Sequence, residues 1–322
     1  MGKDKPAASL PSGVLAITSE VAREHRLKPS VPKVITAIFG RTWVRVLMLG
    51  VAVALSLWSF ERVPHAAWLP ALLGLLPWAF GKYVLCPLRW HALSVSGKPR
   101  RWHLRVYAEA ELLGLISPGH AGADIWRVHK LETTGMNRTS SVAEAALDRL
   151  MGSIGLTLFV VLAGATLPPR VLAATAGIAV FFLVAALVVR RVRPAVLADR
   201  PLPRPSIAAK AVLLSMAYQL TILGMLMGTV AAMGQELNPL QLLGVFGASQ
   251  VAGIVPGMHG ASPREGALVV GLASLGLSWS AAIGAVALTA LLAWLPALLL
   301  GGGSFAVRRL LLARRGRAPA LA

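Results

Sequence analysis

The chain has 322 residues, of which 56% are hydrophobic and only 14% are charged, and its mean hydropathy is +0.68. Soluble domains carry about 25% charged residues, so this composition excludes an ordinary water-soluble protein. The formal net charge of +19 does not indicate a nucleic-acid partner. Lys and Arg gather in short segments beside apolar runs, where such residues set the orientation of membrane helices.

The first 33 residues are polar and lack the basic, apolar and small-residue pattern of a cleaved signal peptide. We expect a cytoplasmic segment at residues 1–33, a membrane domain at 34–306 and a basic cytoplasmic tail at 307–322. A proline-rich basic linker divides the membrane domain into halves, at about residues 34–200 and 206–306.

Six apolar segments approach or exceed the roughly 20 residues that a helix needs to cross hydrocarbon. They lie at about residues 43–60, 67–88, 144–167, 170–189, 207–233 and 279–300. Basic clusters at residues 89–105, 190–204 and 308–317 mark the cytoplasmic side by the positive-inside rule. The sequence therefore predicts an all-α, multi-pass protein of the cell membrane, with both termini in the cytoplasm.

Two further apolar runs, at about residues 104–117 and 240–255, are too short to cross the bilayer. Each ends at a Pro-Gly pair, Pro118-Gly119 or Pro256-Gly257, and a second short helix is expected after each pair, at 124–131 and 265–276. This pattern predicts two re-entrant helical hairpins, the first entering from the cytoplasm and the second from outside. Such an inverted repeat is typical of transporters that bind substrate near the midplane. The alternative is that each hairpin is one kinked full span.

Ionisable side chains cluster at these breaks and at the start of the 144–167 span, although such groups are unfavourable inside a membrane. They are Asp124, Arg127, Asp148, Arg149, Arg264 and Glu265, with His120 and His259 in the loops. One interpretation is that these residues form internal ion pairs that hold the hairpins in place. The other is a polar cavity in which the arginines bind the phosphate of an anionic lipid headgroup. Gly122 and Gly260 allow a close approach or positive φ, or serve helix packing.

Motifs for catalysis are missing from the sequence: there is no His-Glu-x-x-His segment, Walker loop or Gly-x-Ser-x-Gly elbow. His120 and His259 with two carboxylates lack the spacing of metal ligands. We therefore expect no catalytic residues, no metal and no cofactor.

The segments Ser117-Pro118-Gly119, Gly122-Ala123-Asp124, Arg127, Asp148-Arg149 and Pro256 to Gly266 occur in a characteristic order. Together they resemble the lysylphosphatidylglycerol synthase transmembrane-region family, also called the flippase-like domain family, from about Val34 to Ala306. The resemblance implies the handling of membrane lipids. Members that aminoacylate lipids carry an additional soluble domain, which we do not expect in this chain. Ala123, His259 and Ser262 depart from the glycine-rich pattern of the family, which bears on headgroup specificity.

These observations predict a lipid flippase or transporter for an aminoacyl-phospholipid, polyprenyl-phosphate-linked or hopanoid-type lipid. A membrane-embedded lipid-modifying transferase and a scaffold for a lipid-synthesis enzyme are the alternatives. The expected partners are anionic membrane lipids, while an enzyme partner and a homo-oligomer stay open. We predict that a bound phosphate contacts at least one of Arg127, Arg149 and Arg264.

Overall fold

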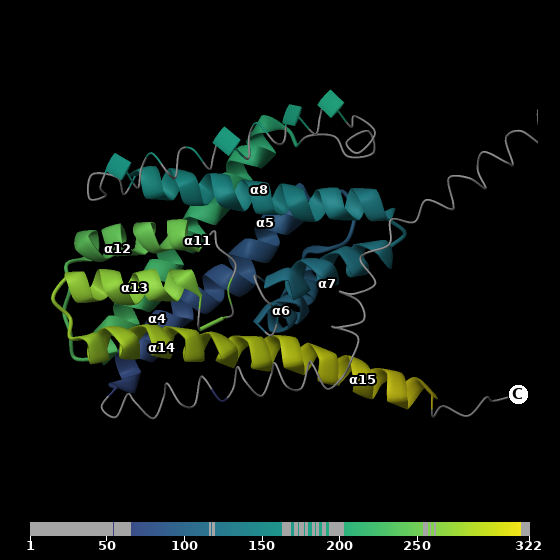
Figure 1. Ribbon diagram of the computed structural model, residues 1–322. Coiled ribbons are helices and arrows are strands. Elements are labelled where there is room, and N and C mark those ends of the chain that lie inside the picture. The colour runs from purple at the N-terminus through teal and green to yellow at the C-terminus, as the bar shows by residue number, and fades with distance from the viewer. Residues whose placement is uncertain are drawn as a thin grey trace, which may run out of the picture. The chain divides into compact units, whose positions relative to one another are not determined.

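In the computed structural model, every regular element of the described residues is a helix (Figure 1). The structure describes residues 66–162 except 116, 118 and 119, residues 203–316 except 254–256, 258 and 261, and a few isolated positions outside these ranges. The described residues lie in one compact unit, Met48–Ala322. The all-α prediction is confirmed for this part of the chain.

Among the described residues, four helices are long and apolar enough to cross a membrane: Trp68–Leu93, Arg138–Leu162, Pro205–Ala232 and Trp279–Arg308. They correspond to four of the six predicted spans. The predicted span at 43–60 and most of the one at 170–189 lie outside the described residues, as does the predicted polar segment at 1–33. The protein thus has helices suited to a membrane in both predicted halves.

Two of these long helices contain a short π-helical turn. The first comprises α4 (Trp68–Phe80), η1 (Gly81–Leu85) and α5 (Cys86–Leu93), and the last comprises α14 (Trp279–Pro296), η4 (Ala297–Gly302) and α15 (Gly303–Gly316). Each turn lies next to a proline, Pro87 or Pro296, which lacks the N–H that the regular ladder needs. In η1 the ladder widens, and the Cys86 N–H bonds to Gly81 O five residues earlier.

The helix α11 (Pro205–Ala232) packs against α4, α5, α14 and α8 (Arg138–Leu162). Its closest approach is to α4, where the backbones of Gly74 and Gly228 meet. A Cβ atom at Gly228 would lie 2.5 Å from Pro70 O, and one at Gly74 would lie 3.0 Å from Gly224 O. Glycines four residues apart allow membrane helices to approach this closely, and here Gly74 and Gly228, which face each other, explain the contact.

The remaining helices form two pairs: α6 (Arg100–Leu115) with α7 (Ala121–Glu132), and α12 (Pro239–Ala252) with α13 (Pro263–Ser274). These pairs occupy the predicted hairpin positions, although Pro118, Gly119 and Pro256 themselves lie outside the described residues. Ser262 and Glu265 form a capping box that begins α13, with Pro263 in its first turn. In Figure 1, α12, α13 and α14 lie side by side.

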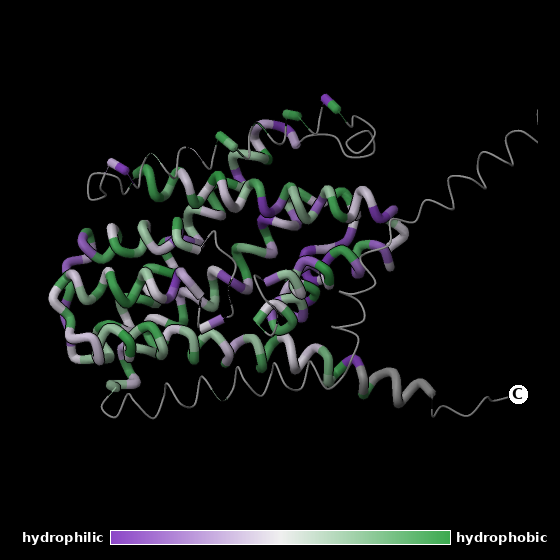
Figure 2. Tube along the Cα trace, in the orientation of Figure 1, coloured by the Kyte–Doolittle hydropathy of each residue, from purple (hydrophilic) through white to green (hydrophobic). Residues whose placement is uncertain are grey.

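Apolar side chains cover both the interior and much of the exterior of the unit. Buried residues from α4, α11, α12, α13 and α14 share one core. Outside it, Leu69, Leu76 and Leu299 are 69%, 66% and 75% exposed. Figure 2 shows that hydrophilic residues concentrate on α6 and α7, whereas α14 is almost entirely apolar. An apolar exterior of this kind suits a helix that faces lipid.

Candidate functional site

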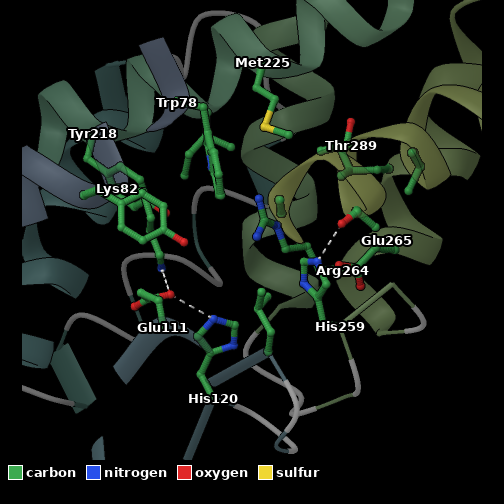
Figure 3. Close-up of a pocket in the computed structure, with 17 residues that line it drawn as sticks. Trp78, Lys82, Glu111, His120, Tyr218, Met225, His259, Arg264, Glu265 and Thr289 are labelled. Carbon is green, nitrogen blue, oxygen red and sulfur yellow. Dashed lines mark hydrogen bonds and ion pairs between the residues drawn. The ribbon is translucent and has the colours of Figure 1, made fainter. Parts of the chain in front are cut away.

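A cavity lies where the two helix pairs meet α4, η1, α11 and α14; most of its surface is apolar, and its volume is about 90 Å³. Its charged and imidazole residues are Lys82, Glu111, His120, His259, Arg264 and Glu265. Figure 3 shows the first three on one wall and the last three on the opposite wall. Because one water needs roughly 10–15 Å³ of such space, the cavity has room for several waters or a group the size of a phosphate.

The first wall is an ion pair with a histidine beside it. Lys82 Nζ lies 2.8 Å from Glu111 Oε2, and the two side chains are 14% and 6% exposed. His120 Nε2 lies 3.5 Å from the same carboxylate oxygen. The ammonium group also stands 5.7 Å from the centre of the Tyr218 ring. The charge of Lys82 is therefore balanced within this wall.

His120 has a left-handed backbone, with φ of 61° and ψ of 17°. Among the described residues it is the only non-glycine with positive φ. Its ring packs against Gly114, where a Cβ atom would come within 3.0 Å of His120 Cδ2. Backbone strain of about 1–3 kcal/mol persists where surrounding contacts enforce it, and such residues concentrate at functional sites.

The opposite wall has a guanidinium group without a carboxylate partner. In the part of the chain that the structure describes, no carboxylate lies within 4 Å of Arg264. With its amide oxygen turned toward Arg264, Gln250 accepts from Nε at 3.2 Å and from Nη2 at 3.3 Å. The neighbouring Glu265 caps its own helix, because its carboxylate accepts from the backbone N–H of Ser262 at 2.9 Å and from the Ser262 hydroxyl.

His259 is fixed beside Arg264 by α14. Its Nε2–H donates to the carbonyl oxygen of Ala290 at 3.0 Å, and its ring meets Trp294 edge-on at 6.3 Å between centroids. Gly260 follows with φ of +87°, a conformation that L side chains rarely adopt. This outcome agrees with the positive φ considered for Gly260 from the sequence.

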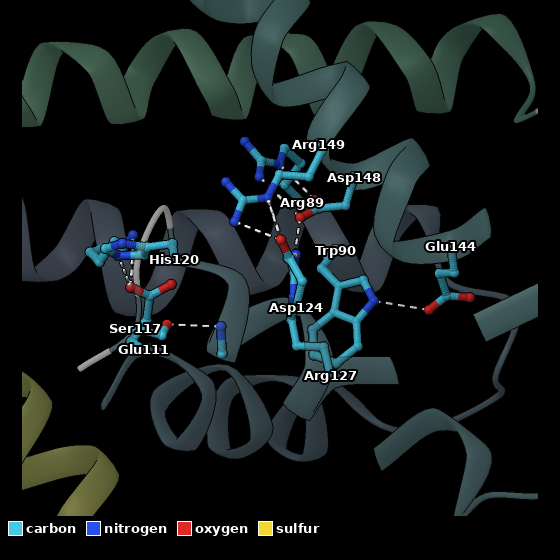
Figure 4. A network of polar contacts seen from close by, with 12 residues as sticks. Arg89, Trp90, Glu111, Ser117, His120, Asp124, Arg127, Glu144, Asp148 and Arg149 are labelled. Carbon is cyan, nitrogen blue, oxygen red and sulfur yellow. Dashed lines mark hydrogen bonds and ion pairs between the residues drawn. The ribbon is translucent and has the colours of Figure 1, made fainter. Parts of the chain in front are cut away.

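The other predicted charges form a separate network beside the cavity (Figure 4). Arg127 donates to Asp148 at 2.7 Å and to Asp124 at 2.6 Å, while Arg149 approaches Asp124 at 2.8 Å. Arg89 binds both oxygens of Asp148, at 2.8 and 3.1 Å. These bonds connect α5, α7 and α8 through three arginines and two aspartates, of which Arg89, Arg127 and Asp148 are buried.

The cavity thus contains four of the ten predicted site residues: His120, His259, Arg264 and Glu265. Asp124, Arg127, Asp148 and Arg149 belong to the ion-pair network, in line with the first of the two interpretations. Gly122 serves close packing, because a Cβ atom there would lie 2.5 Å from Leu113 O, and its N–H donates to Ser117 Oγ at 2.8 Å. Of the three arginines proposed to contact a phosphate, Arg264 alone lines the cavity.

No family model matches the chain, and a search of curated proteins finds no relative. The chemistry of the cavity is therefore the basis for a function. Among the described residues, no group of three His, Cys, Asp or Glu side chains is placed to hold a metal ion. What the cavity offers instead is the guanidinium group of Arg264, whose N–H donors suit an anion.

Sequence reasoning missed Lys82, Glu111 and Arg89 as members of these sites. Lys82 stands alone within the predicted span at 67–88, which is itself a signal, because an ionisable residue inside a membrane helix normally has a partner or a function. By sequence alone, Arg89 belongs to the basic cluster that marks the cytoplasmic side of the membrane. Its pairing with Asp148 joins residues 59 positions apart, and no local pattern predicts that contact.

Proposed function

We propose that this protein is an integral membrane transporter that moves an anionic or glycosylated lipid between leaflets. The headgroup passes through the cavity between the two helix pairs while the acyl chains stay in the surrounding lipid. The observation that carries this proposal is Arg264, which faces the cavity with an amide as partner and, in the described residues, no carboxylate within 4 Å.

The balance of charges in the cavity, a space of low polarity, supports this function. Lys82 pairs with Glu111, and Arg127 pairs with Asp124 and Asp148, but Arg264 has only a neutral partner. Arg264 is half-buried, and a cation in such a setting without a counter-ion is unfavourable, so a bound anion would stabilise it. A phosphate is well suited, because a guanidinium binds two of its oxygens with parallel hydrogen bonds.

The cavity also suits the headgroup of a lipid better than a whole lipid. At about 90 Å³ it accommodates a phosphate but not acyl chains. Leu69, Leu76 and other exposed apolar side chains of the long helices offer a surface along which chains would move. Charged groups inside the cavity and an apolar exterior together support headgroup-first transport.

Part of the proposal is that both helix pairs are re-entrant hairpins arranged as an inverted repeat. Their helices have 16 and 12 residues in the first pair and 14 and 12 in the second. At 1.5 Å per residue, each reaches about 18–24 Å, which is short of the roughly 30 Å of hydrocarbon. The loops of both pairs contribute a histidine to one cavity, as expected for hairpins that enter from opposite faces. Cytoplasmic termini and the cell membrane as location belong to the same proposal.

The test is a liposome assay with the purified full-length protein and a fluorescent phosphatidylglycerol. We expect the protein to move the labelled lipid between leaflets, and Arg264→Gln to abolish movement. Arg101→Gln is the matched control, because Arg101 is exposed on α6 and does not line the cavity. A folded wild-type protein that moves no lipid, or an Arg264→Gln variant as active as wild type, would overturn the proposal. Mass spectrometry of the same lipids would reveal a modified product and thereby favour the transferase alternative.

A further inference from the structure

A second, larger hollow lies where α6 and α7 meet η4 and α15. Its volume is about 660 Å³, and none of its lining residues belongs to the central cavity. We call it the basic groove, after three of its lining residues, Arg105, Lys130 and Arg308. The remainder of its lining includes Trp102, Leu299 and Leu300.

The three cations are available to a ligand. Within the described residues, none of them has a carboxylate oxygen within 4 Å. Lys130 is only 9% exposed, and its ammonium group lies 4.5 Å from the centre of the Trp126 ring. Burial lowers the pKa of Lys130; the nearby charge of Glu109 raises it, and those of Arg308 and Arg105 lower it further. Glu109 balances at most one of the three positive charges, so a bound anion would stabilise the others.

One wall of the groove is held in place by Glu109, because each of its carboxylate oxygens accepts a hydrogen bond from a neighbouring helix. Its Oε2 accepts from Trp126 Nε1 at 3.1 Å, and its Oε1 accepts from Ser304 Oγ at 2.8 Å. The second bond connects α6 to α15 across 195 residues. A Cβ atom at Gly301 would lie 2.5 Å from Ala108 O, so η4 packs directly on the backbone of α6. These contacts fix the positions of α6, η4 and α15, which form walls of the groove.

The remaining lining is apolar and exposed. Leu299, Leu300 and Val307 are 75%, 49% and 57% exposed, and they lie near the end of the Trp279–Arg308 helix. A site for a soluble anion has no need of exposed leucines beside its cations. A phospholipid needs both features, cations for its phosphate and an apolar surface for its chains, and basic pockets between membrane helices bind lipid headgroups in this way.

We propose that the basic groove binds an anionic phospholipid, with its phosphate among Arg105, Lys130 and Arg308 and its chains along Leu299, Leu300 and Val307. This site is separate from the transport cavity and holds a resident or regulatory lipid. It fastens α6 and α7 to the end of the last long helix. Its occupation therefore does not depend on lipid movement through the central cavity.

The experiment uses purified full-length protein in detergent, with dioctanoyl-phosphatidylglycerol as the probe and native mass spectrometry as the readout. We expect Lys130→Gln to weaken lipid binding about tenfold, the effect of one lost charged contact. Arg105→Gln and Arg308→Gln change exposed residues and test the same site if Lys130→Gln does not fold. Lys130→Arg keeps the charge and is expected to keep binding, as is Arg101→Gln.

Further arms identify the ligand and separate this site from the cavity. Dioctanoyl-phosphatidylcholine is expected to bind weakly, and inorganic phosphate at equal concentration is expected not to displace the lipid. Arg264→Gln should leave binding at the groove intact, so failure of the transport proposal and failure of this one give different results. Equal binding of both lipids, displacement by free phosphate, or unchanged binding in all three glutamine variants would overturn the inference. A shift in oligomeric state with unchanged lipid binding would overturn it too, because the groove would then be a protein interface.

Discussion

Arg127 Nη1 and Asp148 Oδ2 lie 2.7 Å apart in the interior, where the two side chains are 5% and 1% exposed. The bond joins α7 to α8, and Arg89 binds the same carboxylate from α5. One aspartate therefore holds three helices through two guanidinium groups. The packing of α7, the second helix of the first pair, against α5 and α8 depends on this carboxylate.

Asp148→Ala is expected to lower the free energy of unfolding by about 3–5 kcal/mol, because it leaves the buried Arg89 without a carboxylate and the buried Arg127 with Asp124 alone. The measurement is thermal or denaturant unfolding in detergent. Glu132→Gln is the matched control, since the side chains of Glu132 and its partner Arg138 are 34% and 55% exposed and their charged groups are 3.8 Å apart. An Asp148→Ala variant as stable as the control would show that the network does not hold the helices together.

Lys82 and Glu111 allow a double-mutant test, because each is the ionic partner of the other at 2.8 Å. Lys82→Met and Glu111→Leu are each expected to destabilise the protein by leaving one charge unpaired. The double variant is expected to be more stable than the sum of the single effects predicts, by about 0.5–3 kcal/mol. Strict additivity of the two unfolding free energies would contradict the pairing.

Periodicity and length predicted the long helices and both helix pairs because those features depend on local sequence. The run from Trp68 to Leu93, for example, is apolar enough to identify by itself. Partners of the charged residues could not be predicted in the same way. Arg89 pairs with Asp148 and Ser304 with Glu109 only because distant helices pack together. The sequence predicted charges near the two helix pairs but could not separate the network around Asp148 from the cavity around Arg264.

Gly228 and Gly224 provide a matched test of the contact between α4 and α11. Gly228→Ala is expected to cost about 1–3 kcal/mol, because its Cβ atom would lie 2.5 Å from Pro70 O, a backbone atom that cannot move away freely. Gly224→Ala is expected to be tolerated, since its nearest neighbour there is Pro77 Cγ at 3.7 Å. The measurement is the melting temperature of each variant in the same detergent. Equal decreases in melting temperature for both variants would contradict this packing.

His103 is expected to make stability depend on pH. Its side chain is buried at 1% exposure, and Nδ1–H donates to Pro99 O at 3.2 Å while Nε2 has no partner among the described residues. Burial lowers the pKa of His103 to about 4, the carbonyl of Pro99 raises it and His91 lowers it.

The sign of the pH effect follows from the unfolded chain, where histidine has a pKa of about 6.5. Between pH 6.5 and 4 the unfolded state binds a proton that the folded state does not, so stability falls as the pH is lowered through this window. Above pH 6.5 this residue has no effect. Melting curves between pH 8 and 4 should show a smaller loss for His103→Gln than for wild type, and parallel curves would contradict the prediction.

His120 tests whether its left-handed backbone serves the cavity or only the turn. His120→Gly removes the strain at φ of 61° together with the ring that lies 3.5 Å from Glu111, whereas His120→Ala removes the ring and keeps the strain. We expect the glycine variant to be more stable than the alanine variant by about 1 kcal/mol, because only glycine adopts this conformation without steric conflict.

A transport assay distinguishes a role of His120 in the cavity from a role in the turn, because both variants lack the imidazole at the wall of the cavity. We expect both to move phosphatidylglycerol more slowly than wild type in liposomes, although the glycine variant keeps the turn without strain. His120→Asn tolerates left-handed backbone and serves as a further control that lacks the ring. Full transport by the glycine variant would mean that residue 120 shapes the turn and that Arg264 and Lys82 meet the headgroup without its imidazole.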